Sequence, residues 1–271
     1  MPDGDVNVTA GASDTYSVVI PEQMEIVSST NPPDGDGKYI SGTVVEFRPN
    51  YTYTVFDVSD GTNALVASNG VYSVTVGTSD INITATINHE YNVNLADAPY
   101  DFTALNNDVL SGTTERTVTI ADGANITLSN ATINGGIICE GSATIILEGS
   151  NNVKGYSSIS KNVFKAGIRV GGEGTVLTIK GNGSLTAIGS DGAAGIGLDC
   201  VRYVDAYGGD IVIEGGTITN CSSTNGAGGA IQAHASTLVI TGGIIEESTT
   251  VNYAYGNIFY NKKIEDFSSI F

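Results

Sequence analysis

The side chains best suited to chemistry lie in one polar stretch, residues 198–210. They combine carboxylates, a guanidinium and phenol rings, at Asp199, Arg202, Tyr203, Asp205, Tyr207 and Asp210. Carboxylates and arginine can hold sugar hydroxyls through paired hydrogen bonds, and a tyrosine face can stack on a pyranose ring. We therefore predict that these residues bind a ligand. The structural alternative is a solvated loop whose tyrosines cover the neighbouring backbone.

The same carboxylates raise the alternative of catalysis. In a polysaccharide-degrading enzyme, Asp199 and Asp205 would serve as general acid and base. No spacing singles out such a pair, because Asp and Glu are abundant throughout, with 29 residues against 11 Lys and Arg. We therefore assign no catalytic residue and expect a protein without enzymatic activity, and a lyase or glycoside hydrolase stays the alternative.

The candidate binding stretch is an insertion between two strands. The chain runs 17 residues from Ile196 to Ile213, against 11 from Ile168 to Ile179 and nine from Ile231 to Ile240. The extra residues must bulge from an otherwise regular repeat. Long loops on a rigid strand scaffold are a common place for binding residues.

The scaffold itself is visible as a pattern that recurs five times. Each copy has a buried-type aliphatic, an exposed residue, and then Asn or Gly, at Leu128-Ser129-Asn130, Leu147-Glu148-Gly149, Ile179-Lys180-Gly181, Ile213-Glu214-Gly215 and Ile240-Thr241-Gly242. Because Asn and Gly adopt a left-handed backbone at the least cost, we predict a positive φ at the third position. A repeat of this kind is typical of a solenoid of strands.

In such a solenoid, equivalent residues of neighbouring coils stack about 4.8 Å apart. We therefore predict that the five leading aliphatics form one interior column. The exposed residues Glu148, Lys180 and Glu214 should then form an outer column whose charges alternate in sign. The expected fold is all-β, a small β-sandwich or grasp-like module followed by a right-handed single-stranded parallel β-helix over about residues 105–250. The handedness follows from the strong preference of parallel crossovers.

The domain organisation follows from an internal repeat. The segment Asp5-Val6-Asn7-Val8-Thr9-Ala10 recurs as Asp80-Ile81-Asn82-Ile83-Thr84-Ala85. We therefore predict the tail of a preceding repeat module at 1–10, a β-rich spacer module at 11–88, and the β-helix at 89–271. Its last residues, about 251–271, are rich in aromatics and should cap the exposed end of the solenoid. The repeated ending indicates a longer parent chain with additional modules.

The composition of the chain excludes several classes of binding partner. The formal net charge of −18 repels nucleic acid and anionic lipid. No apolar run is long enough to span a membrane. We expect no cofactor and no metal centre, because His89 and His234 have no second ligand at metal spacing. Ca²⁺ is the exception, because the many carboxylates of the chain could bind it.

The repeat region resembles the parallel β-helix surface proteins of anaerobic gut bacteria, which are often described as carbohydrate-binding. The likeness covers about residues 105–250 and is carried by segments such as 126–133, 147–153, 177–185 and 213–218. It departs at residues 198–207. The segment Met1–Ala10 resembles the endings of spacer modules in Gram-positive and gut-bacterial surface proteins.

This resemblance implies an extracellular protein, attached to the cell surface through regions outside this chain. It implies no shared set of catalytic residues. The expected function is that of a noncatalytic surface or adhesin-type fragment that presents a β-helix for binding, with glycan as the expected partner. A polysaccharide-degrading β-helix enzyme and a purely structural stalk are the alternatives.

Overall fold

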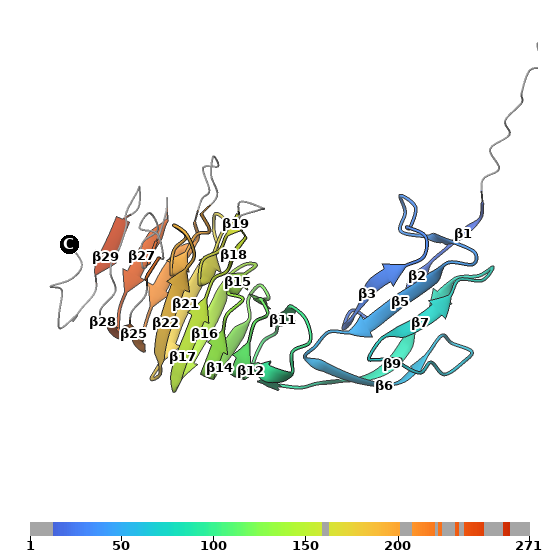
Figure 1. The fold of residues 1–271 in the computed structure, drawn as a ribbon, viewed down its shortest axis with the longest axis horizontal. Coiled ribbons are helices and arrows are strands. Elements are labelled where there is room, and N and C mark those ends of the chain that lie inside the picture. Colours follow the sequence, from blue (N-terminus) through green and yellow to red (C-terminus); the bar gives the residue numbers. More distant parts are fainter. Residues whose placement is uncertain are drawn as a thin grey trace, which may run out of the picture. The chain divides into compact units, whose positions relative to one another are not determined.

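The computed structural model describes residues 13–158, 163–200, 208–219, 222–223, 231–232, 236–246 and 257–260. The chain divides into two compact units between His89 and Glu90 (Figure 1). The regular structure is almost entirely strand, so the prediction of an all-β chain is confirmed. Within the described ranges, no helix has the length and apolar character needed to cross a membrane.

The first unit consists of short strands in small sheets. The largest of these sheets is antiparallel and contains β3 (Met24–Ser29), β5 (Val44–Pro49) and β7 (Tyr72–Thr75). The other antiparallel pairs are β6 (Tyr53–Ser59) with β9 (Thr84–His89) and β1 (Thr15–Tyr16) with β4 (Tyr39–Ile40). One pair is parallel, β2 (Val18–Val19) with β8 (Ile81–Asn82).

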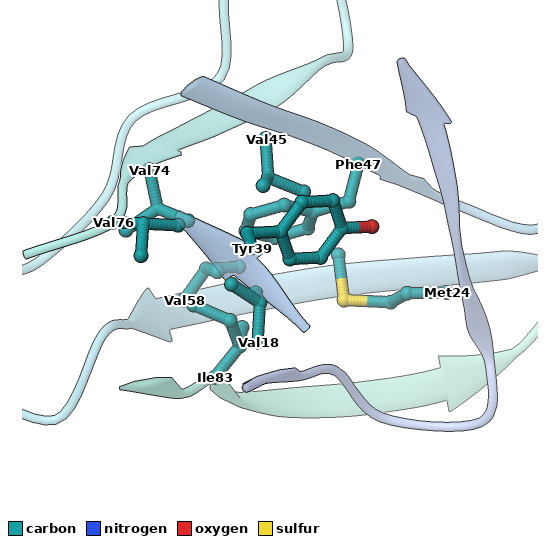
Figure 2. Packing of buried hydrophobic residues seen from close by; sticks show 9 residues of the cluster. All are labelled: Val18, Met24, Tyr39, Val45, Phe47, Val58, Val74, Val76 and Ile83. Carbon is teal, nitrogen blue, oxygen red and sulfur yellow. The ribbon is translucent and has the colours of Figure 1, made fainter. Parts of the chain in front are cut away.

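All of these sheets contribute to one apolar core, which Figure 2 shows at close range. In β5, Val45 and Phe47 point inward and are fully buried, whereas Glu46 between them is exposed. The ring of Phe47 stacks on Tyr72 with the ring centroids 5.9 Å apart. In β5, successive side chains point to opposite faces, and this alternation places the apolar side chains in the core. The predicted tail at 1–10 lies outside the described residues, and the independence of the 11–88 module stays a prediction.

The second unit is a stack of coils, and each complete coil supplies three strand positions, here named A, B and C. Its first strand is β10 (Asn92–Asn94), and a 3₁₀ turn at Leu95–Asp97 comes directly after it. Two strands, β12 (Val109–Thr114) and β14 (Asn125–Ile133), are long enough to cover both A and B. The later A strands are β16 (Ala143–Glu148), β21 (Val176–Gly181), β24 (Asp210–Ile213), β27 (Thr237–Ile240) and β29 (Asn257–Tyr260).

The later B strands are β17 (Ser150–Lys154), β22 (Ser184–Gly189), β25 (Thr217–Thr219) and β28 (Ile244–Glu246), and β26 (Ser222–Ser223) also pairs with β22. The C strands are β11 (Phe102–Ala104), β13 (Val118–Ile120), β15 (Ile137–Cys139), β20 (Ile168–Val170) and β23 (Ile196–Gly197). All pairs within A, B and C are parallel, and the A and B strands form one curled sheet. This arrangement is compatible with the predicted β-helix (Figure 1).

The interior of the coils is a set of aliphatic columns. One column contains Ile126, Ile145, Ile179, Ile213 and Ile240, each opposite the next in the strand register. These side chains are buried. Burial of an aliphatic side chain contributes about 1.5–3 kcal/mol, so such columns supply most of the driving force for stacking.

The predicted single column of five leading aliphatics is wrong at one step. Leu128 does lie opposite Leu147, but Leu147 lies opposite Gly181, two residues beyond Ile179. A slip of two residues keeps every side chain on the same face, so the apolar pattern does not distinguish the two registers. The predicted charge column fails at the same step, because the residue opposite Lys180 is Ile146.

The predicted left-handed turns are confirmed in three copies and wrong in two. The φ angle is positive as predicted at Asn130 (55°), Gly149 (63°) and Gly181 (109°). In the last two copies the positive φ falls one residue later, at Gly216 (82°) and Gly243 (84°). Both of those turns contain two consecutive glycines, and the sequence does not show which glycine takes the left-handed conformation.

The equivalences that define the insertion are confirmed. Ile196 lies opposite Ile168 and also bridges to Ile231, and all three are fully buried. The predicted cap at about 251–271 lies outside the described residues except for β29, whose backbone pairs in parallel with β27.

A candidate binding pocket beside Tyr156

Four of the predicted binding residues lie outside the described part of the chain. These are Arg202, Tyr203, Asp205 and Tyr207. The structure places the other two, Asp199 and Asp210, at opposite ends of the insertion. Their contacts show what each carboxylate does in the fold.

Asp199 is held by groups of the preceding coil. Its Oδ2 lies 2.8 Å from Lys165 Nζ and 3.6 Å from Arg169 Nε. The backbone N–H of Ala166 donates to Oδ1 at 2.8 Å. The side chain is only 9% exposed, so both oxygens face protein groups. Asp199 therefore fixes the start of the insertion, and its role toward a ligand or in catalysis stays a prediction.

Asp210 braces the next coil. Its Oδ1 accepts a hydrogen bond of 2.7 Å from the backbone N–H of Thr237. Side chains just before three other A strands, β12, β14 and β16, accept the same kind of bond from the following coil. Asn106 accepts from the N–H of Asn125, Asp122 from that of Ser142, and the Ser142 hydroxyl from that of Val176. Asp210 thus belongs to a set of inter-coil braces. Its predicted ligand contact is untested.

A pocket that the sequence did not predict lies at the C-terminal ends of the B strands. It is a cavity of about 560 Å³, lined by Glu115, Asn134, Lys154, Gly155, Tyr156, Ser157, Ser190 and Asp191. Parallel neighbours end at the same edge of a sheet, which is why residues that follow different strands meet here. Glu115 follows β12, Asn134 follows β14, and Lys154 ends β17.

The floor of this pocket is fixed by Ser190, which is 7% exposed. Its Oγ accepts from the backbone N–H of Lys165 at 2.9 Å and donates to the carbonyl of Tyr156 at 2.9 Å. Beside it, a Cβ on Gly155 would lie 2.1 Å from the carbonyl oxygen of Lys165. Only glycine permits that approach, so the backbone that carries Tyr156 is held in one place.

The pocket and the predicted insertion are structural neighbours. Tyr156 precedes a small antiparallel hairpin of β18 (Ser157–Ser158) and β19 (Val163–Phe164). The backbone N–H of Cys200 donates to the carbonyl of Phe164 at 3.0 Å. The insertion after Ile196 therefore begins against the hairpin that starts beside Tyr156.

The polar groups of the pocket suit hydrogen bonding to a polyhydroxylated ligand. Tyr156 is 44% exposed and presents a phenol ring to solvent. Asn134 Nδ2 donates to Glu115 Oε1 at 2.7 Å, which orients that carboxylate. Asp191 has a φ of 35°, an uncommon backbone conformation for a residue with a side chain. Strain of this kind is concentrated at functional sites.

Two other kinds of chemistry lack support in the described residues. No group of three or more His, Cys, Asp or Glu side chains there is placed to share a metal ion. Burial raises the pKa of the Cys139 thiol to about 12, although the charge of Arg169 acts in the opposite direction. The thiol therefore stays protonated at neutral pH and is not an activated nucleophile.

Sequence reasoning missed the pocket because its residues come from four coils. One signal was available, the distance of 32 residues from Leu147 to Ile179 against 19 from Leu128 to Leu147. That excess marks the hairpin insertion beside Tyr156.

Comparisons with protein-family models, with curated proteins and with solved structures found no match for this chain. The class of protein that the fold defines is an all-β chain with a curled sheet of parallel strands. The functional argument therefore rests on the pocket.

Proposed function

We propose that this chain is a noncatalytic surface protein of the extracellular space, whose second unit is a right-handed parallel β-helix that binds glycan. The recurring order of A, B and C strands supports the β-helix, and the preference of parallel crossovers supports its hand. The net charge of −18 suits a soluble surface that does not adhere to nucleic acid or anionic lipid.

The observation that carries the proposal is the exposed ring of Tyr156 in a pocket otherwise lined by Gly155 and by polar side chains. Its volume of about 560 Å³ lies within the usual range of small-ligand sites. The tyrosine face supplies a stacking surface for a sugar ring. The carboxylate of Glu115 and the amide of Asn134 supply an acceptor and a donor for hydroxyls.

The structural order of the site also supports binding at a rigid surface. Ser190 and Gly155 hold the backbone of Tyr156 in place. A backbone held in one conformation loses little conformational entropy when a ligand binds beside it. Because less entropy is lost on binding, the sum of several weak sugar contacts gives a measurable affinity.

The test is a glycan array with the full chain, run with and without Ca²⁺. The variant Tyr156→Ala should lose retention on the glycans that the parent retains. Tyr91→Ala is the matched control, because Tyr91 is 50% exposed and lies outside the pocket. Retention by Tyr156→Ala equal to that of the parent would contradict the proposed site, and no retention by the parent would favour the structural stalk.

The same experiment distinguishes the enzyme alternative. Each retained glycan is incubated with the protein and its products are separated by chain length. Intact glycan supports a noncatalytic protein. Shortened or unsaturated products that disappear in Glu115→Gln or Asp191→Asn would show a catalytic carboxylate in the pocket.

A further inference from the structure

The pocket is lined by residues of four successive coils. In the first three coils its residues occupy matching places on the B strands, because Thr114 lies opposite Ile133 and Ile133 lies opposite Val153. Glu115, Asn134 and Lys154 each come one residue after those positions, so they form a column across three coils. The fourth coil contributes Ser190 and Asp191, which follow β22. They lie two and three residues beyond Ile188, the residue opposite Lys154.

The strand spacing sets the length of this column. With neighbouring strands about 4.8 Å apart, Glu115 and Lys154 are separated by about 10 Å along the stack, and Glu115 lies about 14 Å from the level of the fourth coil, which carries Asp191. A single sugar ring does not reach from one end to the other. A ligand that contacts Glu115 and Asp191 together must be extended along the stack.

We propose that the pocket binds a linear, uncharged glycan laid along the stack, with one sugar facing each of the four coils. This inference rests on the proposed glycan-binding function and adds the form and orientation of the ligand. A sugar in an extended chain advances by a length close to one strand spacing. Successive sugars therefore meet successive coils. Tyr156, two residues after Lys154 in the third coil, is the stacking surface.

The charges of the pocket determine the class of glycan. Two carboxylates, Glu115 and Asp191, outnumber the single cation Lys154 among the lining residues. The chain as a whole carries −18. Uronate-containing or sulfated chains are repelled by this field, whereas neutral sugars are not. The carboxylates instead accept hydrogen bonds from hydroxyls at the two ends of the bound chain.

The experiment measures affinity against chain length with the full chain, by calorimetry. The probes are β-1,4-linked oligosaccharides of glucose, mannose and N-acetylglucosamine, from one to six units. In at least one series, affinity should rise about two- to tenfold with each added sugar, as expected for one or two new hydrogen bonds. The rise should end at four sugars, the number of coils that the pocket covers.

Variants at the two ends test the orientation. Glu115→Ala and Asp191→Gly should each reduce the affinity for the tetrasaccharide to that of the parent for the trisaccharide. Asp191→Gly also relieves the positive φ, so a lower affinity does not arise from backbone strain. Tyr156→Ala should weaken every length. Glu140→Ala, an exposed carboxylate outside the pocket, is the matched control and should bind as the parent does.

The outcomes separate this inference from the function on which it rests. Affinity that does not depend on length, or that stops rising at one or two sugars, overturns the extended orientation but leaves glycan binding in place. Tighter binding of oligogalacturonate than of every neutral series overturns the uncharged class. Failure of all three series and of the glycan array overturns the proposed function itself.

Discussion

Lys165 and Asp199 join two insertions of consecutive coils. The Nζ of Lys165 lies 2.8 Å from Asp199 Oδ2, and the next backbone N–H, that of Ala166, donates to Asp199 Oδ1 at 2.8 Å. Lys165 follows the hairpin beside Tyr156, and its own N–H donates to Ser190 in the pocket floor. One carboxylate is therefore linked through the backbone to the pocket beside Tyr156.

Replacing Asp199 with Ala should destabilise the second unit by about 1–3 kcal/mol, because a mostly buried cation and a backbone N–H both lose their acceptor. Asp199→Asn should cost less, since its amide oxygen still accepts from Ala166. Urea unfolding measures both values. Glu140→Ala is the control for loss of an exposed charge and should stay within about 0.5 kcal/mol. Equal stability of Asp199→Ala and the parent would show that these contacts do not hold the insertion.

Asn151 is a polar residue in an otherwise apolar interior column, with Leu185 opposite it in the next coil. Its Oδ1 accepts from Ala131 N–H, and its Nδ2 donates to the carbonyls of Glu148 and Ser184 at 3.0 and 3.1 Å. Because each of these backbone groups would lose this partner, Asn151→Ala should lower the free energy of unfolding by about 1–3 kcal/mol.

The neighbouring residue provides the control for that measurement. Asn152 is exposed, so Asn152→Ala should change the free energy of unfolding by less than about 0.5 kcal/mol. If both variants unfold at the same denaturant concentration, the buried amide contributes nothing beyond its neighbour.

The register between β16 and β21 can be tested through charge. In the structure Ile146 lies opposite Lys180, so Ile146→Glu should couple favourably to Lys180 by about 0.2–1 kcal/mol. A double-mutant cycle with Lys180→Ala isolates that coupling from the cost of losing the isoleucine. The native Glu148 should couple to Lys180 more weakly. Stronger coupling of Lys180 to Glu148 than to Ile146→Glu would instead support the register that the repeat alone predicted.

The first unit should lose stability in acid. Hydrogen bonds from the backbone N–H and the hydroxyl of Ser17 lower the pKa of Asp80 from its ordinary value of 3.8. A proton therefore binds Asp80 more tightly in the unfolded state than in the folded state. The stabilisation of the folded state by ionised Asp80 is complete above about pH 4. It is lost as the pH falls through the lowered pKa of the folded state.

Thermal unfolding from neutral pH down to about pH 2 measures this effect. Asp80→Asn should show a smaller decrease with pH than the parent. Ser17→Ala keeps the backbone donor and should lie between the two. An identical pH dependence of Asp80→Asn and the parent would show that other carboxylates, such as Asp34 and Asp60, account for the acid sensitivity.

The sequence by itself determined the class of fold and the inward face of each strand. Apolar alternation in 126–128, 145–147 and 177–179 requires one buried face, and those aliphatics are buried. The turn positions followed from Asn130, Gly149 and Gly181 for the same local reason, the low cost of a left-handed backbone. These are properties of single residues and of their nearest neighbours in the chain.

Only the tertiary structure decided the register and the pocket. The alignment of Leu147 with Gly181 differs from the predicted one by two residues, and both alignments bury the same face. Glu115, Asn134, Tyr156 and Asp191 come together only when four coils stack in that register. Contacts between residues far apart in the chain depend on the register of every intervening coil. The spacing along the chain does not specify that register.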